Sequence, residues 1–429
     1  MEGDIIMRFC VIGAGSGGRA FAAYISSKGH PVSLYNRSFT RISSIKQEGG
    51  IEVEGALEGF FHLELVTQNL QMAVKDVDII MVVIPASAHK ALAKKLAPFL
   101  SDNQLIVLNP GRTFGSAEFK RIIEKKRKYL SIIVGETQTL LFTARELPKN
   151  GVNIIKIKDS VNLSTFPGKH VYDAGDKLMD VFPQFDPTDN YLEVTLNNIG
   201  MLLHPAISLL NAGMIDFGKD FKFYREGATS NVCRILEWVE FEVNEIFKKL
   251  GLKQFRFYKW AKQAYGVDAT STFEALQKVE AYKDINAPDE LITRYFTEDV
   301  PTGLVPIISL GAFLNVPTPT IHSIIHLSSI LCNVDFRRIG RTLENLKLSE
   351  FLINHLKERK MLEEELKGYY TVERILLKPR RFKICSHCET LNLCDNESCW
   401  LCSLKDFREL DEEDLKQIKN KKAKALIRT

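Results

Sequence analysis

The sequence has almost no excess of charge and no tract that would keep it unfolded. Its 57 basic and 53 acidic residues leave a net charge of only +4. A protein that covers nucleic acid with its whole surface is usually more basic, so the charge balance disfavours that class and leaves only a local basic patch open. No proline-rich or serine-rich stretch interrupts a chain that is 45% hydrophobic and 26% charged. The 429 residues can therefore fold, and they predict two or three domains.

An export signal and a membrane span are also missing. Met1 to Asp4 carry acid where a secretory signal needs positive charge. Two stretches without Asp, Glu, Lys or Arg, 194–215 and 300–334, have the length of membrane helices. Asparagines and His204-Pro205 interrupt the first, and four prolines interrupt the second. We predict a cytoplasmic protein without a membrane partner, in which both stretches are buried.

Cysteine is scarce outside one short segment near the C-terminus. Five of the eight cysteines fall between Cys385 and Cys402, which argues against a secreted disulfide scaffold. Two Cys-x2-Cys pairs in this segment could supply four thiolates in tetrahedral arrangement: Cys385, Cys388, Cys399 and Cys402. We therefore predict a structural zinc site in the C-terminal extension.

The order of apolar runs predicts the fold class. Short, fully apolar runs alternate with helical patterns from residue 9 to residue 134, which is typical of a parallel sheet covered on both faces. A period-two stretch over 51–66 predicts a hairpin near the sheet edge. Past residue 190 long helical patterns dominate. We predict an α/β Rossmann domain over 1–190, an all-α domain over 191–370, and a zinc-ribbon-like segment with a C-terminal helix over 378–429.

A glycine turn follows the first predicted strand. Its residues are Gly13, Gly15, Gly17 and Gly18, in a Gly-x-Gly-x-x-Gly pattern between a strand and a helix. Gly15 would let the backbone approach a pyrophosphate, and Gly18 would allow close packing of the helix. The turn therefore predicts a dinucleotide site at a helix N-terminus.

The residues after the second predicted strand, Asn36, Arg37 and Ser38, include no acid. An acidic residue there would hold a ribose 2′-hydroxyl and repel a 2′-phosphate, whereas Arg37 can bind that phosphate. The pattern favours NADP over NAD. The alternative is that Arg37 is a solvated loop cation and NAD is the cofactor.

Polar loops follow three further predicted strands. Open parallel sheets bind ligands beyond the carboxyl ends of their strands. We therefore expect Pro85, Asn109 and Gly111, together with the Glu136-Thr137 loop, to surround the nicotinamide.

Several ordered motifs resemble the octopine/nopaline (opine) dehydrogenases. They include the glycine turn, Asn109-Pro110-Gly111-Arg112-Thr113, the segment 198–205, Phe223-Tyr224-Arg225-Glu226-Gly227 and the segment 294–306. The resemblance runs from about residue 7 to 350. It implies reductive condensation, in which an amino acid amine forms an imine with a 2-oxo acid and NAD(P)H delivers hydride to the imine carbon.

The resemblance also implies roles for particular residues. His204 matches the family's catalytic histidine, whose imidazole suits general acid/base work near neutral pH, and Asp299 matches its acidic partner. Arg294 matches an arginine suited to bridging the cofactor pyrophosphate and the helical domain. Glu136 and Thr137 match contacts to the amino-acid substrate. Taken singly, His204 could be a core histidine and Asp299 a helix cap.

The C-terminal segment carries a second resemblance, to the zinc fingers of nuclear-pore Ran-binding proteins. Asn392 lies between its two cysteine pairs as in that family, but Lys383 stands where the family has tryptophan. Three basic residues precede the first cysteine pair, Arg380, Arg381 and Lys383, and could contact a nucleic acid or an acidic protein partner. A short basic run is more often a solvated surface, which we favour.

Two other function classes stay open at this point. One is another two-domain Rossmann reductase of a hydroxyacid or glycerol-phosphate type, which would use a catalytic lysine. No lysine occurs between Val194 and Asp216, which counts against it. The other is a non-catalytic NADP-sensing regulator whose zinc segment binds a partner.

Overall fold

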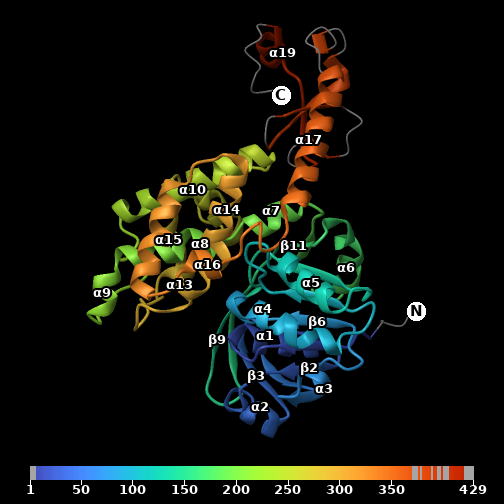
Figure 1. Cartoon of the computed structure of the whole chain (residues 1–429), viewed down its shortest axis with the longest axis vertical. Helices are drawn as coiled ribbons and strands as arrows, with labels where there is room; N and C mark the ends of the chain where they lie inside the picture. Colours follow the sequence, from blue (N-terminus) through green and yellow to red (C-terminus); the bar gives the residue numbers. More distant parts are fainter. Residues whose placement is uncertain are drawn as a thin grey trace. The chain divides into compact units, whose positions relative to one another are not determined.

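The computed structural model describes residues 6–369, 375–376, 379–387, 390–393, 398–399 and 405–419 (Figure 1). The chain divides into two compact units. The first consists of Met1–Glu242 and Phe255–Leu346, and the second of Val243–Gln254 and Lys347–Thr429. The first unit holds both the sheet domain and the helical domain that the sequence predicts. The second unit takes in Lys347–Thr429, so α17 (Ser349–Tyr369) groups with the C-terminal segment.

An eight-stranded sheet forms the centre of the sheet domain, in the order β12-β11-β8-β7-β6-β1-β2-β5. Its strands are β1 (Phe9–Ile12), β2 (Val32–Tyr35), β5 (Leu65–Thr67), β6 (Ile79–Val82), β7 (Leu105–Leu108), β8 (Ile133–Thr137), β11 (Val161–Thr165) and β12 (Phe185–Pro187). The six neighbouring strands β8, β7, β6, β1, β2 and β5 run parallel to one another. Strand β11 is antiparallel to β8. The predicted Rossmann class is confirmed.

The apolar strands are continuous because each one packs on both faces. In β1, Phe9 and Val11 belong to one core and Cys10 and Ile12 to the other, as the two-residue period of a strand requires. Helix α1 (Ser16–Ser27) and α6 (Val171–Leu178) pack on the first face. Helices α4 (His89–Leu96) and α5 (Gly115–Lys126) pack on the second.

The predicted hairpin exists, but it joins a separate sheet. β3 (Gly50–Gly55) and β4 (Gly59–His62) are antiparallel and combine with β10 (Val152–Ile157) and β9 (Phe142–Glu146) in the order β4-β3-β10-β9. Their apolar residues pack with α1 in the first core. Only the segment just after the hairpin, β5, reaches the edge of the main sheet, where it pairs with β2.

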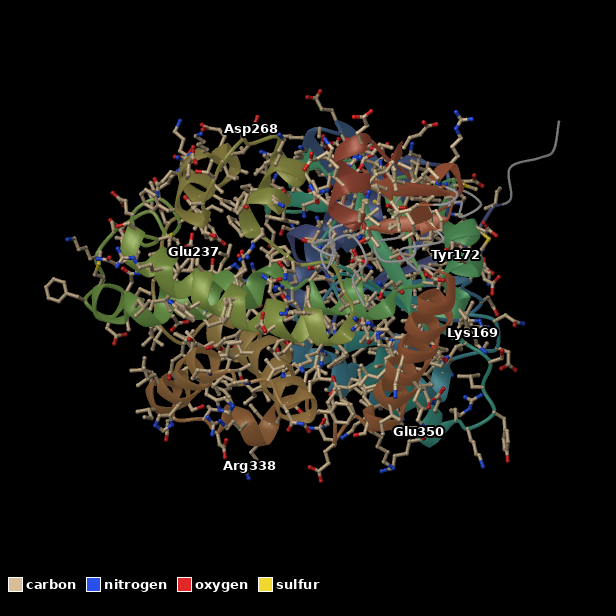
Figure 2. The ribbon with its side chains drawn as sticks, turned by 90° about the horizontal axis from the view of Figure 1, so that it is seen from above. Lys169, Tyr172, Glu237, Asp268, Arg338 and Glu350 are labelled. Carbon is tan, nitrogen blue, oxygen red and sulfur yellow. The ribbon has the colours of Figure 1, made fainter. Side chains whose placement is uncertain are left out.

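Helices dominate from residue 191 to residue 369. Asn190 caps the first of them by accepting a hydrogen bond from Glu193 N. The elements are α7 (Tyr191–Leu196), α8 (Ile199–Leu210), α9 (Ala212–Asp216), α10 (Ser230–Leu250), α11 (Phe257–Tyr265), α12 (Thr272–Lys278), α13 (Arg294–Thr297), η6 (Val300–Leu304), α14 (Val305–Leu314), α15 (Pro319–Cys332) and α16 (Phe336–Ile339). Glu237, labelled on α10 in Figure 2, accepts a hydrogen bond from Thr272 N at the start of α12.

The two charge-free stretches lie inside the helical domain, in α8–α9 and in η6–α15. Most of their apolar side chains are buried against the domain. Among the described residues, no helix is both long enough and apolar enough to cross a membrane.

The second unit has its own small core. The sheet β14-β13-β15, made of β13 (Phe382–Cys385), β14 (Leu391–Leu393) and β15 (Phe407–Glu409), is antiparallel. Helix α19 (Glu412–Lys419) adds Ile418 to the core of Ile375, Phe382, Ile384 and Leu391. Asp411 caps this helix by accepting a hydrogen bond from Asp414 N at 2.8 Å.

Candidate active site

The glycine turn between β1 and α1 leaves no room for side chains at two of its positions. Gly13 has φ +116°, and a Cβ there would lie 2.2 Å from Val83 O. A Cβ on Gly18 would lie 1.9 Å from Gly13 O, which is shorter than any tolerated contact. The close helix packing predicted for Gly18 is therefore observed, because strand and helix approach to backbone contact.

The amide end of α1 is open, in contrast to the packed glycines. Gly15 is the N-cap residue, and no side chain caps the helix. A Cβ on Gly15 would meet only the Glu146 carboxylate, at 3.7 Å, whereas Gly17 packs against Leu140 and Val83. Backbone N–H groups at an uncapped helix start attract anions. The turn fits the phosphates of a dinucleotide.

The residues after β2 have two different surroundings: Asn36 forms hydrogen bonds that hold the glycine turn, and the Arg37 side chain is exposed. Asn36 Oδ1 accepts from Ala14 N at 3.3 Å, and its Nδ2 donates to Ser38 O at 3.0 Å. Asn36 therefore holds the glycine turn and its own loop together. Arg37 is exposed, and its guanidinium has no hydrogen bond or ion pair with any residue that the structure describes. The position is open for a phosphate, and the preference for NADP stays a prediction.

The strand-end loops place their residues at different depths. Pro85 is exposed, whereas Asn109 is buried and donates from Nδ2 to Val107 O at 2.9 Å. A Cβ on Gly111 would lie 2.5 Å from the Glu136 carboxylate, so the loop rests directly on that side chain. Contact of these residues with a nicotinamide stays a prediction.

Glu136 and Thr137, the predicted substrate contacts, are both buried at the end of β8. Glu136 Oε2 accepts from Ser116 N at 2.5 Å at the start of α5. Burial raises the pKa of Glu136, although hydrogen bonds from Thr195 and Ser116 oppose the rise. Thr137 Oγ1 donates within the sheet to Leu108 O at 3.4 Å. Their observed contacts are internal, and their role toward substrate stays a prediction.

His204 and Asp299, 95 residues apart in sequence, meet inside the helical domain. His204 Nδ1 lies 2.7 Å from Asp299 Oδ2. Asn198 caps α8 through Met201 N and so fixes the helix that carries His204. Asp299 immediately precedes η6, a π-helical turn of a kind common at functional sites. The structure thus brings together the two residues that the resemblance paired.

Two tyrosines contact the rest of the His204 ring, one at Nε2 and one on the flat face of the ring. Its Nε2 lies 2.9 Å from the Tyr224 hydroxyl. The ring of Tyr295 stacks on it with 4.3 Å between centroids. Sequence reasoning named both tyrosines inside motifs but gave them no role, because only the tertiary structure brings them to the histidine.

Arg112 supplies the positive charge that Asp299 needs. Its Nη2 lies 3.6 Å from Asp299 Oδ1, its Nε donates to Glu298 Oε1 at 3.2 Å, and its Nη1 donates to Asn198 Oδ1 at 3.0 Å. Burial of Asp299 opposes its ionisation, but Arg112 and His204 outweigh burial and hold the pKa of Asp299 below its ordinary value. Asp299 is therefore a carboxylate. The signal that could have identified Arg112 was the adjacent pair of acids at 298 and 299, whose burial requires a cation.

Arg294 lies on the first turn of α13, and it is exposed. Its guanidinium carbon lies 6.0 Å from the centre of the Tyr295 ring, and it forms no ion pair with another described residue. Its charge is thus available next to the tyrosine that stacks on His204. The predicted contact with a cofactor pyrophosphate stays a prediction.

Lys158 is a residue that the sequence did not point to. Its Nζ donates to Leu140 O at 2.5 Å and to Thr139 Oγ1 at 3.2 Å, in the loop after β8. Burial, together with the charges of Arg112 and Lys156, lowers the pKa of Lys158 to about 8. Lys158, which follows β10, thus places a lysine of lowered pKa against the loop after β8.

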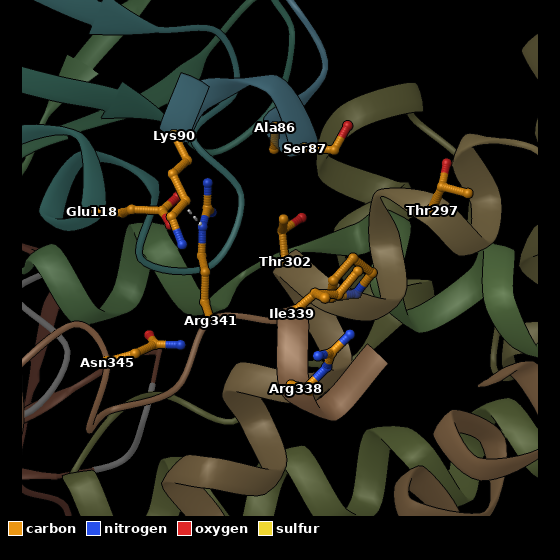
Figure 3. Close-up of a pocket in the computed structure, with 11 residues that line it drawn as sticks. Ala86, Ser87, Lys90, Glu118, Thr297, Thr302, Arg338, Ile339, Arg341 and Asn345 are labelled. Atoms are coloured by element: carbon orange, nitrogen blue, oxygen red, sulfur yellow. Dashed lines mark hydrogen bonds and ion pairs between the residues drawn. The ribbon is translucent and has the colours of Figure 1, made fainter. Parts of the chain in front are cut away.

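A cavity of about 560 Å³ lies on the α4 and α16 side of the first unit (Figure 3). It includes Thr297 and Thr302, which flank Asp299, but neither His204 nor the glycine turn lines it. Arg341 on its wall donates to Glu118 Oε2 at 2.9 Å. The cavity is therefore separate from the His204 site, although it borders the same segment.

The predicted zinc ligands are only partly within the described residues. Cys385 and Cys399 are both buried in the second unit, and Asn392 Nδ2 donates to Cys399 Sγ at 3.4 Å. Cys388 and Cys402 lie outside the described residues. Within the parts of the chain that the structure describes, no three His, Cys, Asp or Glu side chains are grouped to hold a metal ion.

The fold and the site together define a class. A doubly wound sheet with a glycine turn that fits a dinucleotide, followed by a helical domain that carries a buried histidine–carboxylate pair, is typical of two-domain NAD(P)-dependent oxidoreductases.

Comparisons with known proteins narrow this class. The profile described as NAD/NADP octopine/nopaline dehydrogenase, alpha-helical domain, matches residues 187–332. The profile of the NAD-dependent glycerol-3-phosphate dehydrogenase N-terminus matches residues 8–136. The chain is 39% identical over 342 residues to the opine dehydrogenase of Arthrobacter sp. (strain 1C), covering 80% of this chain and 95% of that one.

Two solved structures share the fold. Octopine dehydrogenase in complex with NADH and agmatine has a TM-score of 0.67 at 18% identity, covering 80% of this chain and 96% of that chain. Yersinopine dehydrogenase with NADP+ bound has a TM-score of 0.64 at 14% identity, covering 82% and 99%. With the sequence relationship, these findings establish that the chain belongs to the opine dehydrogenase family, whose members are NAD(P)-dependent oxidoreductases acting on CH–NH groups.

Proposed function

We propose that this protein reductively condenses the amine of an amino acid with a 2-oxo acid, or catalyses the reverse oxidation, with His204 as general acid/base and Asp299 as its partner. The observation that carries the proposal is the 2.7 Å contact between His204 Nδ1 and the buried Asp299 carboxylate. This pair lies in a chain that belongs to a family of imine-reducing enzymes.

The glycine turn, Asn36 and Arg37 would hold the dinucleotide, together with the loops at Pro85, Asn109 and Gly111. When bound, NAD(P)H supplies the hydride that reduces the imine carbon. We propose NADP as the preferred cofactor, because the guanidinium of Arg37 is exposed and no acid in its loop would repel a 2′-phosphate. Arg294 would contact the pyrophosphate from the helical domain.

His204 exchanges the protons that condensation requires. The amine adds to the carbonyl carbon, the carbonyl oxygen takes up a proton, and the resulting hydroxyl leaves as water when it is protonated. An imidazole flanked by a carboxylate can donate these protons near neutral pH and recover them in the reverse direction. Asp299 fixes the proton on Nδ1 and stabilises the imidazolium.

Arg112 would keep this pair in its working charge state. Its guanidinium is only 13% exposed, and it faces both Glu298 and Asp299 from the sheet domain. Without that cation, two adjacent buried acids would repel each other, and one of them would take up a proton. The carboxylate of Asp299 would then no longer stabilise a protonated His204.

Substrate contacts fall on the loop after β8. We propose that Glu136 and Thr137 shape this end of the site, with Glu136 acting through its hydrogen bond to Ser116 N. The loop itself would meet the amino acid. Two small-molecule substrates, an amino acid and a 2-oxo acid, are the partners that this proposal requires.

The alternatives are less well supported. A hydroxyacid or glycerol-phosphate reductase would place a lysine near His204, and α8 contains none. The glycerol-3-phosphate dehydrogenase profile ends at residue 136 and does not reach the helical domain. A non-catalytic sensor would leave the histidine–carboxylate pair without a purpose.

The decisive experiment is a substrate screen. Purified protein and NADPH are mixed with pools of amino acids crossed with pyruvate, glyoxylate and 2-oxoglutarate, and loss of absorbance at the NADPH band is followed. Mass spectrometry then identifies the product. A secondary amine with the summed mass of both substrates, less one oxygen, would support the proposal. Reduction of an oxo acid in the absence of any amine would contradict it.

We also propose that Cys385, Cys388, Cys399 and Cys402 bind one structural zinc ion. The support is the spacing of the two pairs and the burial of Cys385 and Cys399. The Asn392 amide that donates to Cys399 Sγ is the type of outer hydrogen bond that orients a thiolate ligand.

A further inference from the structure

Both nitrogens of the His204 ring are engaged within the protein. Nδ1 faces the Asp299 carboxylate at 2.7 Å, and Nε2 faces the Tyr224 hydroxyl at 2.9 Å. An ionised carboxylate can only accept, so Nδ1 carries a hydrogen. A neutral His204 therefore accepts from the Tyr224 hydroxyl through Nε2, and a protonated His204 donates to it. The nitrogen that would exchange protons with a substrate is covered by a phenol.

The Tyr224 ring is held firmly in this position. It is 5% exposed and stacks on Tyr282 with 4.3 Å between centroids and 21° between planes. Phe223 packs edge-on against it at 5.0 Å. A ring fixed on two sides is not readily displaced, because core side chains are closely packed in their rotamers. The route from Nε2 to a substrate therefore leads through the hydroxyl.

Resting on the proposed function of His204, we propose that Tyr224 relays the proton between His204 and the reacting oxygen of the substrate. In the dehydration step, the Nε2–H proton moves to the phenolic oxygen while the phenolic hydrogen moves to the hydroxyl of the amine–carbonyl adduct. The C–O bond breaks, water leaves, and the nitrogen lone pair forms the C=N bond. His204 ends neutral, and Tyr224 again carries one hydrogen.

The surroundings of Tyr224 favour a transfer in which both protons move together. Burial raises its pKa well above the ordinary value, and the neighbouring Tyr295 adds to the rise, while Arg294 opposes it. A phenolate is therefore not populated between two separate steps. A relay with a concerted transfer involves two hydrogens in flight, which solvent isotope measurements can count.

The test compares Tyr224→Phe with the wild type, using NADPH and the best substrate pair. Phenylalanine keeps the ring and its stack but removes the relay hydrogen. We expect kcat to fall on the order of 10²-fold, with NADPH affinity and the melting temperature nearly unchanged. The wild type should give a curved dependence of kcat on the deuterium fraction of the solvent, and the variant should give a smaller, linear one.

Tyr282→Phe is the matched control, because it also removes a phenolic hydroxyl from the same stack and keeps the ring. That hydroxyl has no hydrogen bond to His204 within the described residues. The control should keep the kcat and the curved isotope dependence of the wild type. Replacement of Tyr224 by 3-fluorotyrosine, which retains the hydroxyl, should restore most of the activity lost in Tyr224→Phe.

Each other outcome has a definite meaning. If Tyr224→Phe turns over at the wild-type rate while His204→Ala is inactive, His204 reaches the substrate directly, and the relay is wrong although the proposed function stands. If both variants keep full turnover, the proposed role of His204 fails and the relay fails with it. If the wild type converts no substrate pair, both proposals are overturned.

Discussion

Arg112 Nη2, from the loop after β7 of the sheet domain, lies 3.6 Å from Asp299 Oδ1 of the helical domain. The acid that holds His204 is thus neutralised by a cation from the other domain. His204 and Asp299 both belong to the helical domain, so it is the neutralising charge of Arg112 that requires the sheet domain.

Arg112→Met should therefore weaken both stability and turnover. Removing one member of a buried ion pair typically costs about 3–5 kcal/mol, because the remaining charges stay buried without a partner. The pKa of Asp299 should rise as a consequence. Urea unfolding gives the free energy of unfolding, and Arg112→Lys, which keeps the charge, serves as the control. An unchanged unfolding midpoint in Arg112→Met would show that Glu298 and Asp299 do not depend on this cation.

His204→Ala should separate binding from chemistry. The sheet domain carries the glycine turn and Arg37, so NADPH affinity should stay nearly intact, while turnover should fall by a factor of about 10²–10⁴. Asp299→Asn should have a milder defect, because the imidazole remains and only its stabilising charge is lost. Fluorescence titration and steady-state kinetics measure the two effects. Full turnover in His204→Ala would mean that another residue is the acid/base.

Arg37→Ala should weaken NADPH selectively. The guanidinium is exposed beside the glycine turn and free of ion pairs with described residues, so its loss removes a phosphate contact and little else. NADH affinity should not change. Arg8→Ala is a suitable control. Arg8 pairs with Glu64 and lies at the amino end of β1, whereas the glycine turn follows the carboxyl end of that strand. Equal affinity of the wild type for NADPH and NADH would refute the prediction.

Lys158 should make stability depend on pH. Its pKa is about 8 in the folded protein and roughly 10.4 in an unfolded chain. Between these values the unfolded state binds more protons, so the free energy of unfolding should gain on the order of 1 kcal/mol from this group as pH rises. Lys158→Met should remove this gain, and Lys156→Met should keep most of it, because burial is the largest cause of the Lys158 shift and the charge of Lys156 is only the last of its three causes. Urea unfolding at pH 7.5 and pH 10 compares the three proteins.

The zinc prediction can be tested apart from catalysis. Native mass spectrometry should find one zinc ion per chain, and the double variant Cys385→Ser, Cys388→Ser should lose it. A chain that ends after Tyr369 should retain dehydrogenase activity, because the residues at the proposed active site all belong to the first unit. Loss of NADPH binding on truncation would show that the C-terminal segment supports the catalytic unit.

The sheet domain was predictable because its strands leave a local signal. β1, β6 and β7 are buried along their whole length, and such strands appear in the sequence as unbroken apolar runs. The pairing of β3 with β10 was not predictable, since it joins residues about 100 positions apart. Period-two patterns indicate a strand but do not identify its partner.

The site was predictable at the residues that motifs carry and not at those that only tertiary contacts define. His204 and Asp299 came from the resemblance, and the structure brings them to 2.7 Å. Arg112 and Tyr224 stood in quoted motifs without a role, because nothing in their neighbourhood in sequence indicates a buried acid or an imidazole. Lys158 left no signal, since its pKa is lowered by burial and by the charge of Arg112, which is distant in sequence.

The loop over residues 111–114 is fastened to the helical domain from several sides. Arg341 Nη1 donates to Gly111 O and Thr113 O, Thr113 N donates to Thr302 O, and Phe114 N donates to Thr195 Oγ1. If the sheet domain and the helical domain rotate against each other with these bonds intact, the rotation axis lies near this loop, since sliding would break all four bonds together. In such a rotation, residues far from this loop would move most, and residues beside it would move least. His204 and Asp299, which Arg112 ties to this loop, would then stay together during such a rotation.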